Sequence, residues 1–147
     1  RVAVVKPLAD DRYDPDALAT HDGRTLGATA LRSAQELLHA ARGADLVIID
    51  EVHFFGAALA GPVEQLLASG VAVAAAGLET DHRGAVFEPM DRLLHLATVV
   101  TRLTCPCAVC GGPATHTQRL TPGGGRIVVG GPGMYEARCA GCFRPGV

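Results

Sequence analysis

Short aliphatic runs alternate with segments of helical period along the first hundred residues. The aliphatic runs have the length of β-strands, and they occupy residues 2–5, 46–49, 71–76 and 99–103. Apolar residues at helical spacing fill the intervals before the second, third and fourth of these runs. This alternation predicts an α/β fold, with a parallel sheet flanked by helices.

The ends of the predicted helices carry the expected signals. Ser33 and Glu36 form a capping-box pattern at the start of the first helix, and Gly43 ends it. Pro62 stands near the start of the second helix, which Gly70 ends. Polar, turn-rich stretches without any period are predicted to be loops, and they cover residues 9–15, 20–24 and 78–84.

Two carboxylates follow the run at 46–49, which is continuously aliphatic and therefore predicts a strand covered on both faces. Asp50 and Glu51 come directly after it, at the sheet edge where open α/β proteins bind ligands. Successive side chains at a strand end point opposite ways. One carboxylate is then free to face a phosphate-bound Mg²⁺ and the other a substrate hydroxyl. The alternative is that one of them only caps the helix that follows.

Composition and charge narrow the class of protein. With 147 residues and 48% hydrophobic content, the chain has enough material for one domain and a small appendage. The net charge is −2 with both signs interspersed, so no basic face indicates binding to nucleic acid or to anionic lipid. No apolar run has the length of a membrane span or of a signal peptide, and we therefore expect a cytoplasmic protein.

The composition changes at Thr104. Glycine, proline and cysteine become frequent after it, and the apolar runs become short. We therefore predict two domains, an α/β core over residues 1–103 and a small second domain over residues 104–147.

Four of the five cysteines form two C-x-x-C pairs within this second domain. Two residues separate Cys107 from Cys110, and two residues separate Cys139 from Cys142. This spacing is typical of a tetrahedral Zn²⁺ site. Four thiolates leave no open coordination position, so the zinc is expected to be structural. Two disulfides are the alternative, which a cytoplasmic chain disfavours. Cys105 is expected to be a spare thiol.

Two glycine clusters, at residues 123–125 and 130–133, lie between short strand-like runs of the second domain. A phosphate-binding loop follows a strand and opens a helix, and these clusters do neither. They are predicted to be turns, or backbone that comes close to a ligand.

Several motifs occur together in the order found in the type II thymidine kinases, the zinc-containing cellular and bacterial type. Over residues 4–142 the chain resembles that family. The motifs are Lys6-Pro7, Asp10-Asp11-Arg12-Tyr13, Thr20-His21-Asp22-Gly23, the segment 49–55, Gly77-Leu78, Thr117-Gln118-Arg119-Leu120, and Val129-Gly130-Gly131 leading to the segment 135–139. The resemblance implies a P-loop-NTPase-like core with a carboxy-terminal zinc-ribbon domain whose loop folds over the base like a lasso. It also implies transfer of a phosphoryl group from ATP to the 5′-hydroxyl of thymidine to give dTMP, a homotetramer, and feedback inhibition by dTTP.

The resemblance assigns roles to matching positions. Glu51 corresponds to the general base, and Asp50 corresponds to the acid near the Mg²⁺ that accompanies ATP. Phe54 and Phe87 correspond to the walls of the thymine pocket, and Tyr135 corresponds to the ring that closes the loop on the deoxyribose. The residues that correspond to the loop over the base are Thr117, Val128, Val129, Gly130 and Gly131.

The chain also departs from the family pattern. His53 stands where Gln is usual, and Glu79 and His82 stand where Asp and an aromatic residue are common. The family's first strand, phosphate loop and helix have no counterpart here, because Lys6 is the only lysine and no glycines precede it. We therefore expect the 147 residues to be catalytically inactive by themselves. The alternative is a non-catalytic nucleoside-binding or regulatory remnant of the family.

Overall fold

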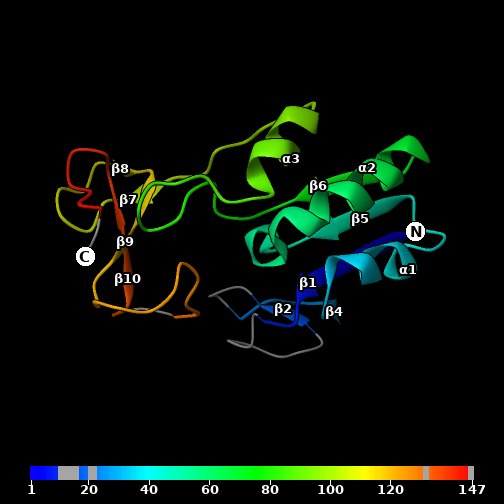
Figure 1. Cartoon of the computed structure of the whole chain (residues 1–147), viewed down its shortest axis with the longest axis horizontal. Coiled ribbons are helices and arrows are strands. Elements are labelled where there is room, and N and C mark those ends of the chain that lie inside the picture. Colours follow the sequence, from blue (N-terminus) through cyan, green and yellow to red (C-terminus); the bar gives the residue numbers. More distant parts are fainter. Residues whose placement is uncertain (10–16, 20–22, 131–132, 146–147) are drawn as a thin grey trace.

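A four-stranded parallel sheet with the order β4-β1-β5-β6 forms the centre of the computed structural model, which describes residues 1–9, 17–19, 23–130 and 133–145 (Figure 1). The strands are β1 (Val2–Pro7), β4 (Thr29–Leu31), β5 (Leu46–Ile49) and β6 (Ala72–Ala75). In the register, Val5 lies beside Ile49, and Ile49 lies beside Ala75. The carboxyl ends of these strands therefore meet at one edge, and the predicted α/β fold is confirmed.

Two compound helices connect these strands. The 3-10 helix η1 (Ala34–Glu36) runs into α1 (Leu37–Ala40), and η2 (Val52–Leu59) runs into α2 (Ala60–Ala68). The third helix, α3 (Met90–Leu96), follows β6. No described helix combines the length and the apolarity needed to cross a bilayer.

The predicted capping box at the first helix is wrong in its details. Ser33 occupies the N-cap of η1, but its side chain makes no capping hydrogen bond. The carboxylate of Glu36 instead accepts a hydrogen bond of 2.9 Å from the backbone N–H of Arg32, one residue earlier. The helix begins where the sequence indicates, although only one of the two side chains satisfies a backbone donor there.

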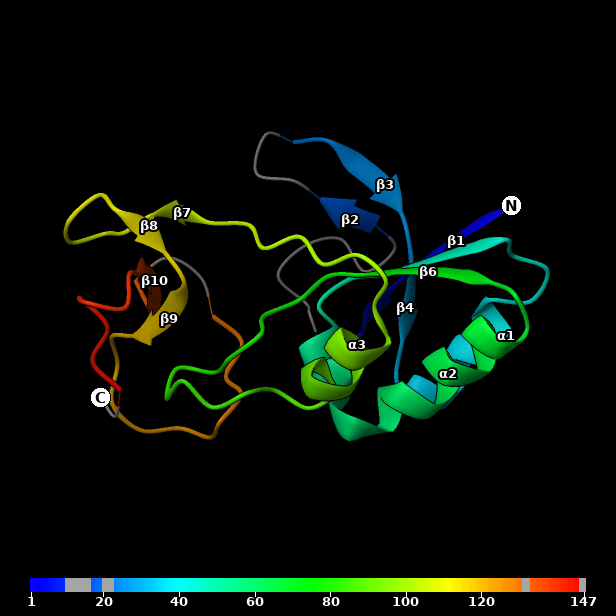
Figure 2. The same ribbon diagram turned by 90° about the horizontal axis from the view of Figure 1, so that it is seen from above.

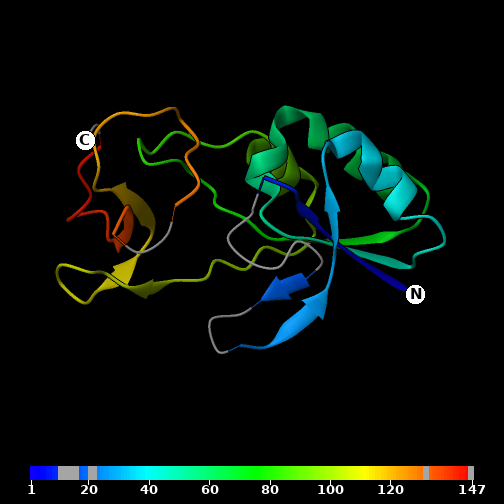
Figure 3. The same cartoon turned by 90° about the horizontal axis from the view of Figure 1, so that it is seen from below.

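Strand β5 is not covered equally on its two faces, contrary to the prediction from its aliphatic run. Val47 and Ile49 are fully buried, whereas Leu46 and Ile48 are only half-buried. Helices α1 and α2 lie together on one face of the sheet (Figures 2 and 3). The buried residues face these helices, so burial alternates even where hydrophobicity does not.

The predicted strand over residues 99–103 is also wrong. Val99 is 81% exposed and Leu103 is 89% exposed, and the segment is extended without a strand partner among the described residues. β6 is the last strand at its edge of the sheet, and three of its four residues are exposed although the run is aliphatic. An aliphatic run forms a strand only where backbone hydrogen bonds can be made, and residues 99–103 lack them.

A β-hairpin that sequence patterning did not predict consists of β2 (Ala17–Ala19) and β3 (Thr25–Gly27). It lies on the opposite side of the sheet from α1 and α2 (Figures 2 and 3). Its strands of three residues are too short to show a period. The loops predicted nearby fall mainly on residues 10–16 and 20–22, which lie outside the described residues.

The last third of the chain forms two small antiparallel sheets at the end of the molecule remote from α1 (Figure 1). Strand β7 (Cys105–Pro106) pairs with β8 (Pro113–Ala114), and β9 (His116–Arg119) pairs with β10 (Tyr135–Arg138). Gly123 and Gly124 have φ values of 81° and 83°, which L-residues rarely adopt. The glycine cluster at 123–125 therefore forms a turn, as predicted. The domain division at Thr104 stays a prediction.

Candidate nucleoside site at the carboxyl end of the sheet

Glu51 has a left-handed backbone conformation directly after β5. Its φ is 47° and its ψ is 45°, and among the described residues it is the only non-glycine residue with a positive φ. Such a conformation costs on the order of 1–3 kcal/mol and is concentrated at functional sites. Its side chain makes no capping hydrogen bond to η2, so Glu51 does not have the capping role considered above. The turn, rather than strand alternation, sets the direction of its carboxylate.

Asp50 lies between β5 and Glu51 and is half-buried. Its backbone N–H donates to the carbonyl of Val5 at 3.0 Å, which continues the parallel ladder by one residue. Its carboxylate is not part of the cavity that Glu51 lines. Of the two adjacent acidic residues, Glu51 lines the cavity and Asp50 does not.

His53 is buried next to Glu51, with 4% of its surface exposed. Its Nδ1 lies 3.5 Å from Oε2 of Glu51 and accepts a hydrogen bond of 3.3 Å from the backbone N–H of Leu78. The imidazole ring lies 4.5 Å from the ring of Phe54 and 5.0 Å from that of Phe87, between ring centroids. His53 thus joins η2 to the chain that follows β6.

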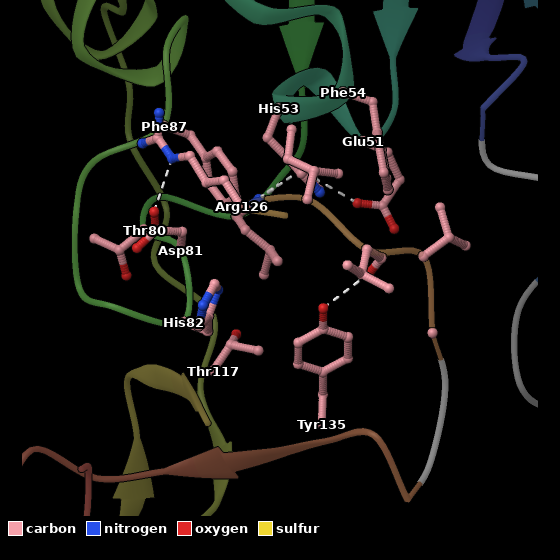
Figure 4. A pocket seen from close by; sticks show the side chains of 15 residues that line it. Glu51, His53, Phe54, Thr80, Asp81, His82, Phe87, Thr117, Arg126 and Tyr135 are labelled. Atoms are coloured by element: carbon pink, nitrogen blue, oxygen red, sulfur yellow. Dashed lines mark hydrogen bonds and ion pairs between the residues drawn. The ribbon is translucent and has the colours of Figure 1, made fainter. Parts of the chain in front are cut away.

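A cavity of about 250 Å³ lies beside these residues. Figure 4 shows Glu51, His53 and Phe54 on one side of it, and Thr117 and Tyr135 on the opposite side. The residues that line it are Glu51, His53, Phe54, Leu78, Thr80, Asp81, His82, Phe87, Thr117, Arg126, Ile127, Val128, Val129, Gly130 and Tyr135. Its volume is close to the lower end, roughly 300 Å³, of pockets that bind small organic molecules.

Most of the residues predicted for the substrate site meet in this cavity. They are Glu51, Phe54, Phe87, Thr117, Val128, Val129, Gly130 and Tyr135. Asp50 is not among the lining residues, and Gly131 lies outside the described residues. The two departures from the family pattern at positions 53 and 82 are also part of the lining.

A hydrogen-bond network shapes the segment that closes the cavity from the carboxy-terminal side. The hydroxyl of Tyr135 donates to the carbonyl of Val128 at 2.8 Å, and Arg119 donates to that hydroxyl at 2.9 Å. The buried guanidinium of Arg119 also donates to the carbonyls of Gly123 and Gly125, both at 3.0 Å. Arg119 and Tyr135 are opposite each other in the β9–β10 register, so this small sheet sets the course of the glycine-rich segment.

The opposite wall includes His82, which is buried with 6% exposure. Burial, followed by the charge of Arg119, lowers the pKa of His82 below its ordinary value, although the charge of Asp81 opposes the shift. The imidazole is therefore neutral at pH 7, and a neutral imidazole can donate one hydrogen bond and accept another. Phe87 also lines the cavity, so the lining offers both apolar contact and hydrogen bonding.

Sequence patterning missed five residues of the lining. They are Leu78, Thr80, Asp81, Arg126 and Ile127. One signal was available for Arg126, because it is a single charge between three glycines and three β-branched residues. A long cationic side chain in such a run has to reach a partner or solvent.

Four sulfur atoms form a second candidate site, and none of their cysteines lines the cavity. The Sγ atoms of Cys107, Cys110, Cys139 and Cys142 all lie within 4.8 Å of one another. Tetrahedral Zn²⁺ with Zn–S bonds of about 2.3 Å separates its sulfurs by about 3.8 Å, so this cluster is compatible with a structural zinc ion. The Sγ atoms of Cys110 and Cys139 are 3.6 Å apart, too far for a disulfide of about 2.05 Å.

Backbone amides also support the thiolate form that a metal requires. The N–H groups of Cys139 and Cys110 lower the pKa of the Cys107 thiol to about 6. The pKa of Cys139 is also lowered, mainly by the backbone N–H of Cys142. Hydrogen bonding with Cys139 and Cys110 raises the pKa of Cys142 to about 12, as expected where one proton is shared among crowded sulfurs. Cys105 is exposed and outside the cluster, as predicted.

The fold and the cavity define an α/β protein with a ligand site at the carboxyl end of a parallel sheet, next to a four-cysteine metal-site candidate. The family model for thymidine kinase matches residues 1–143 of the chain. A thymidine kinase from Rhodothermus sp. is 43% identical over 145 residues, which are 99% of this chain and 68% of the relative. A thymidine kinase from Bdellovibrio bacteriovorus is 40% identical over 148 positions, 100% of this chain and 72% of the relative. The chain belongs to the thymidine kinase family.

Proposed function

We propose that the cavity at the carboxyl end of the sheet binds thymidine and that the site acts in the phosphorylation of its 5′-hydroxyl to give dTMP. One observation carries the proposal: eight residues expected from the family pattern, from distant parts of the chain, line one cavity, and the strained Glu51 is one of them. Strain at a lining carboxylate supports a functional rather than a structural role.

In this proposal each wall of the cavity recognises a different part of the nucleoside. Phe54 and Phe87 present apolar rings to the faces of the pyrimidine. Thr117 and the backbone from Val128 to Gly130 provide donors and acceptors for its polar edge. The Tyr135 ring lies against the deoxyribose, and its hydroxyl is already held by Val128 and Arg119.

Glu51 is the general base in this proposal. Its carboxylate accepts the proton of the 5′-hydroxyl while the oxygen attacks the γ-phosphorus of ATP, and the bond from that phosphorus to the bridging oxygen breaks to release ADP. A base contributes about 10²- to 10⁴-fold to such a step when it lies within hydrogen-bond reach of the hydroxyl. The turn that fixes the Glu51 backbone restricts the carboxylate to a narrow range of positions before any substrate binds.

Asp50 would hold the Mg²⁺ that accompanies ATP, because it is a half-buried carboxylate at the end of β5 and Mg²⁺ prefers oxygen ligands. The ion neutralises phosphate charge when it is bound. Lys6, the only lysine of the sequence, is 2% exposed and donates to the carbonyl of Ala17 at 3.0 Å. We therefore propose that residues 1–147 hold the nucleoside but need a phosphate loop, supplied by other residues, for phosphoryl transfer.

We also propose, from membership of the family, a metal ion, a compartment, an oligomeric state and an inhibitor. The four-cysteine cluster binds one structural Zn²⁺, the enzyme is a cytoplasmic homotetramer, and dTTP inhibits it by binding at the same site. A non-catalytic nucleoside-binding or regulatory role is the second candidate.

Calorimetry tests the nucleoside site in the chain as it stands. Thymidine is expected to bind with a stoichiometry of about one per chain, and adenosine is not, because the proposed contacts of Phe54, Phe87 and Thr117 are arranged around a one-ring base. The variant Glu51→Gln should bind thymidine almost as tightly. Equal binding of adenosine and thymidine would reject the assignment of the cavity.

Activity distinguishes the two candidates. With a family-type strand, phosphate loop and helix placed ahead of Arg1, we expect ATP- and Mg²⁺-dependent formation of dTMP, and Glu51→Gln should reduce kcat by roughly 10²- to 10⁴-fold. Glu64→Gln is the matched control, because Glu64 lies on α2 and pairs only with Arg92 in the described contacts. Thymidine binding without any phosphorylation in that protein would favour the regulatory candidate.

A further inference from the structure

Arg126 connects the glycine-rich segment to the loop that follows β6. Its Nε donates to Oδ2 of Asp81 at 2.7 Å, and one terminal nitrogen donates to the carbonyl of Val86 at 2.6 Å. The other terminal nitrogen lies 3.6 Å from a carboxylate oxygen of Glu88. The guanidinium carbon is 5.1 Å from the centroid of the Phe87 ring. All three nitrogens of one side chain therefore contact a single loop from another part of the chain.

Asp81 is held in place to receive this cation. Its side chain is only 2% exposed, and its second oxygen, Oδ1, accepts hydrogen bonds of 2.9 Å from the backbone N–H groups of Arg83 and Ala85. Burial, the largest effect, raises the pKa of Asp81, but the hydrogen bonds and the charge of Arg126 together lower it below its ordinary value. A buried, ionised carboxylate with a fixed orientation requires a cation beside it.

The ion pair lies at the border of the cavity. Asp81 lines one wall, and the four residues after Arg126, which are 127–130, line the other. Figure 4 shows the interaction between Arg126 and the Asp81 loop next to Phe87. At its other end, this segment is held by the hydrogen bond from Tyr135 to Val128. Among the described contacts, the side chain of Arg126 therefore joins this segment to Asp81, Val86 and Glu88, and the backbone of Arg126 also interacts with the imidazole of His82.

We propose that Arg126 is a positioning residue for the nucleoside, which fastens segment 126–130 to the Asp81 loop and so controls how tightly thymidine is held. The proposal rests on the proposed function for the identity of the nucleoside. Without the ion pair, the binding-competent arrangement is less populated, and the apparent dissociation constant rises in inverse proportion to that population.

The first test compares thymidine affinity in three proteins by calorimetry. Arg126→Met removes the guanidinium but keeps an apolar stem over Phe87, and we expect the Kd to rise at least tenfold. Arg126→Lys keeps the charge but cannot reach Asp81, Val86 and Glu88 together, so its effect should be intermediate. An unchanged Kd in both variants would overturn the proposal.

A matched control comes from a second ion pair of the same loop. Arg102 donates to both oxygens of Glu79 at 3.0 and 3.2 Å, and the two side chains are 65% and 42% exposed. This pair does not involve the segment 126–130. Arg102→Met therefore removes the same kind of interaction without releasing the cavity wall, and it should leave the Kd within about twofold, as for surface pairs in general.

A double-mutant cycle tests whether Arg126 acts through Asp81. Asp81→Asn keeps the acceptor for Arg83 and Ala85 but removes the charge, so Arg126→Met should cost much less affinity in that background than in the wild type. Additive losses would show that Arg126 influences the site by another route and would contradict the proposal.

The nucleoside-free protein gives a readout that does not depend on the identity of the ligand. Amide hydrogen exchange of residues 127–130 should be faster in Arg126→Met than in the wild type or in Arg102→Met, with the exchange of β5 unchanged in all three. If the wild type fails to bind thymidine yet shows this pattern, the proposed function fails and the role of Arg126 stands. If exchange is the same in all three proteins, the role of Arg126 fails, whatever the wild type binds.

Discussion

Nδ1 of His53 faces both Oε2 of Glu51, at 3.5 Å, and the backbone N–H of Leu78, at 3.3 Å. A single ring nitrogen cannot accept a proton from Leu78 and donate one to Glu51 at the same time. While the Leu78 bond is made, Nδ1 is unprotonated and its single lone pair accepts that N–H. His53 therefore positions the backbone after β6, and it does not supply a proton to Glu51 in this arrangement.

The variant His53→Leu tests this role. It keeps most of the side-chain volume between Phe54 and Phe87 but leaves the N–H of Leu78 without its acceptor, which should lower the free energy of unfolding by about 1–3 kcal/mol. His53→Asn places an amide oxygen near the position of Nδ1. Amide exchange at Leu78, measured by NMR, should be faster in His53→Leu than in the wild type, and much less accelerated in His53→Asn. Equal exchange in the two variants would show that the bond has no role.

The left-handed backbone at Glu51 should reduce the stability of the fold. Glycine adopts a φ of 47° without the penalty that a Cβ imposes, so Glu51→Gly should be more stable to urea than Glu51→Ala by about 1 kcal/mol. In helix α2 the order is expected to reverse, with Glu64→Gly less stable than Glu64→Ala by about 1 kcal/mol. The same order at both positions would mean that the backbone of Glu51 is not strained.

The sequence predicts the α/β class and the location of the site because both follow from local patterns. The aliphatic run before Asp50 specifies β5, and strand ends in parallel sheets are where ligands bind. The same pattern fails for residues 99–103, because hydrophobicity identifies a segment that can pair but not whether a neighbouring strand is available. Short strands such as β2 and β3 also escape prediction, since three residues show no period.

Within the site, family motifs identify residues that line the cavity, whereas the contacts that hold its walls together are visible only in three dimensions. Asp81 and Arg126 are 45 residues apart, and nothing in their local sequence relates them. Gly77 is a similar case, because a Cβ there would lie 2.8 Å from Cγ2 of Val52, a close approach that the motif Gly-Leu does not reveal. Pairwise geometry of this kind depends on the whole fold.

Zinc removal should affect one part of the molecule only. Cys139→Ser deletes one of the four ligands, and because structural zinc contributes on the order of 10 kcal/mol to small modules, we expect the region after Thr104 to lose its structure. The sheet of β4, β1, β5 and β6 should persist, as judged by amide exchange. Cys105→Ser is the control, because this exposed thiol is outside the cluster and its loss should leave one zinc per chain. Elemental analysis that finds no zinc in the wild type would contradict the assignment.

The Asp81–Arg126 pair predicts a pH dependence with a defined sign. The pKa of Asp81 is lowered in the folded protein, because the hydrogen bonds and charge of Arg126 and the amides of Arg83 and Ala85 outweigh burial. A lowered pKa means that the carboxylate stabilises the fold fully above its unfolded pKa of about 3.9, and that this contribution is lost as the pH falls through the lower, folded value. The advantage of the wild type over Asp81→Asn should therefore be constant from pH 7 to about pH 5 and should shrink below about pH 4.

Other titrating groups near the pair have to be kept equal for this comparison. Glu88 faces Arg126 and is present in both proteins. The pKa of Glu79 is lowered, first by its hydrogen bond from Arg102, and because this effect is common to both proteins it cancels in the difference between their free energies of unfolding. His82 does not cancel, because the charge of Asp81 raises its pKa against the larger effect of burial. Both proteins should therefore carry His82→Gln, and their free energies of unfolding should be measured in urea from pH 7 to pH 3. A difference that grows as the pH falls would have the wrong sign for a carboxylate stabilised by Arg126, and it would show that the pair does not exist in solution.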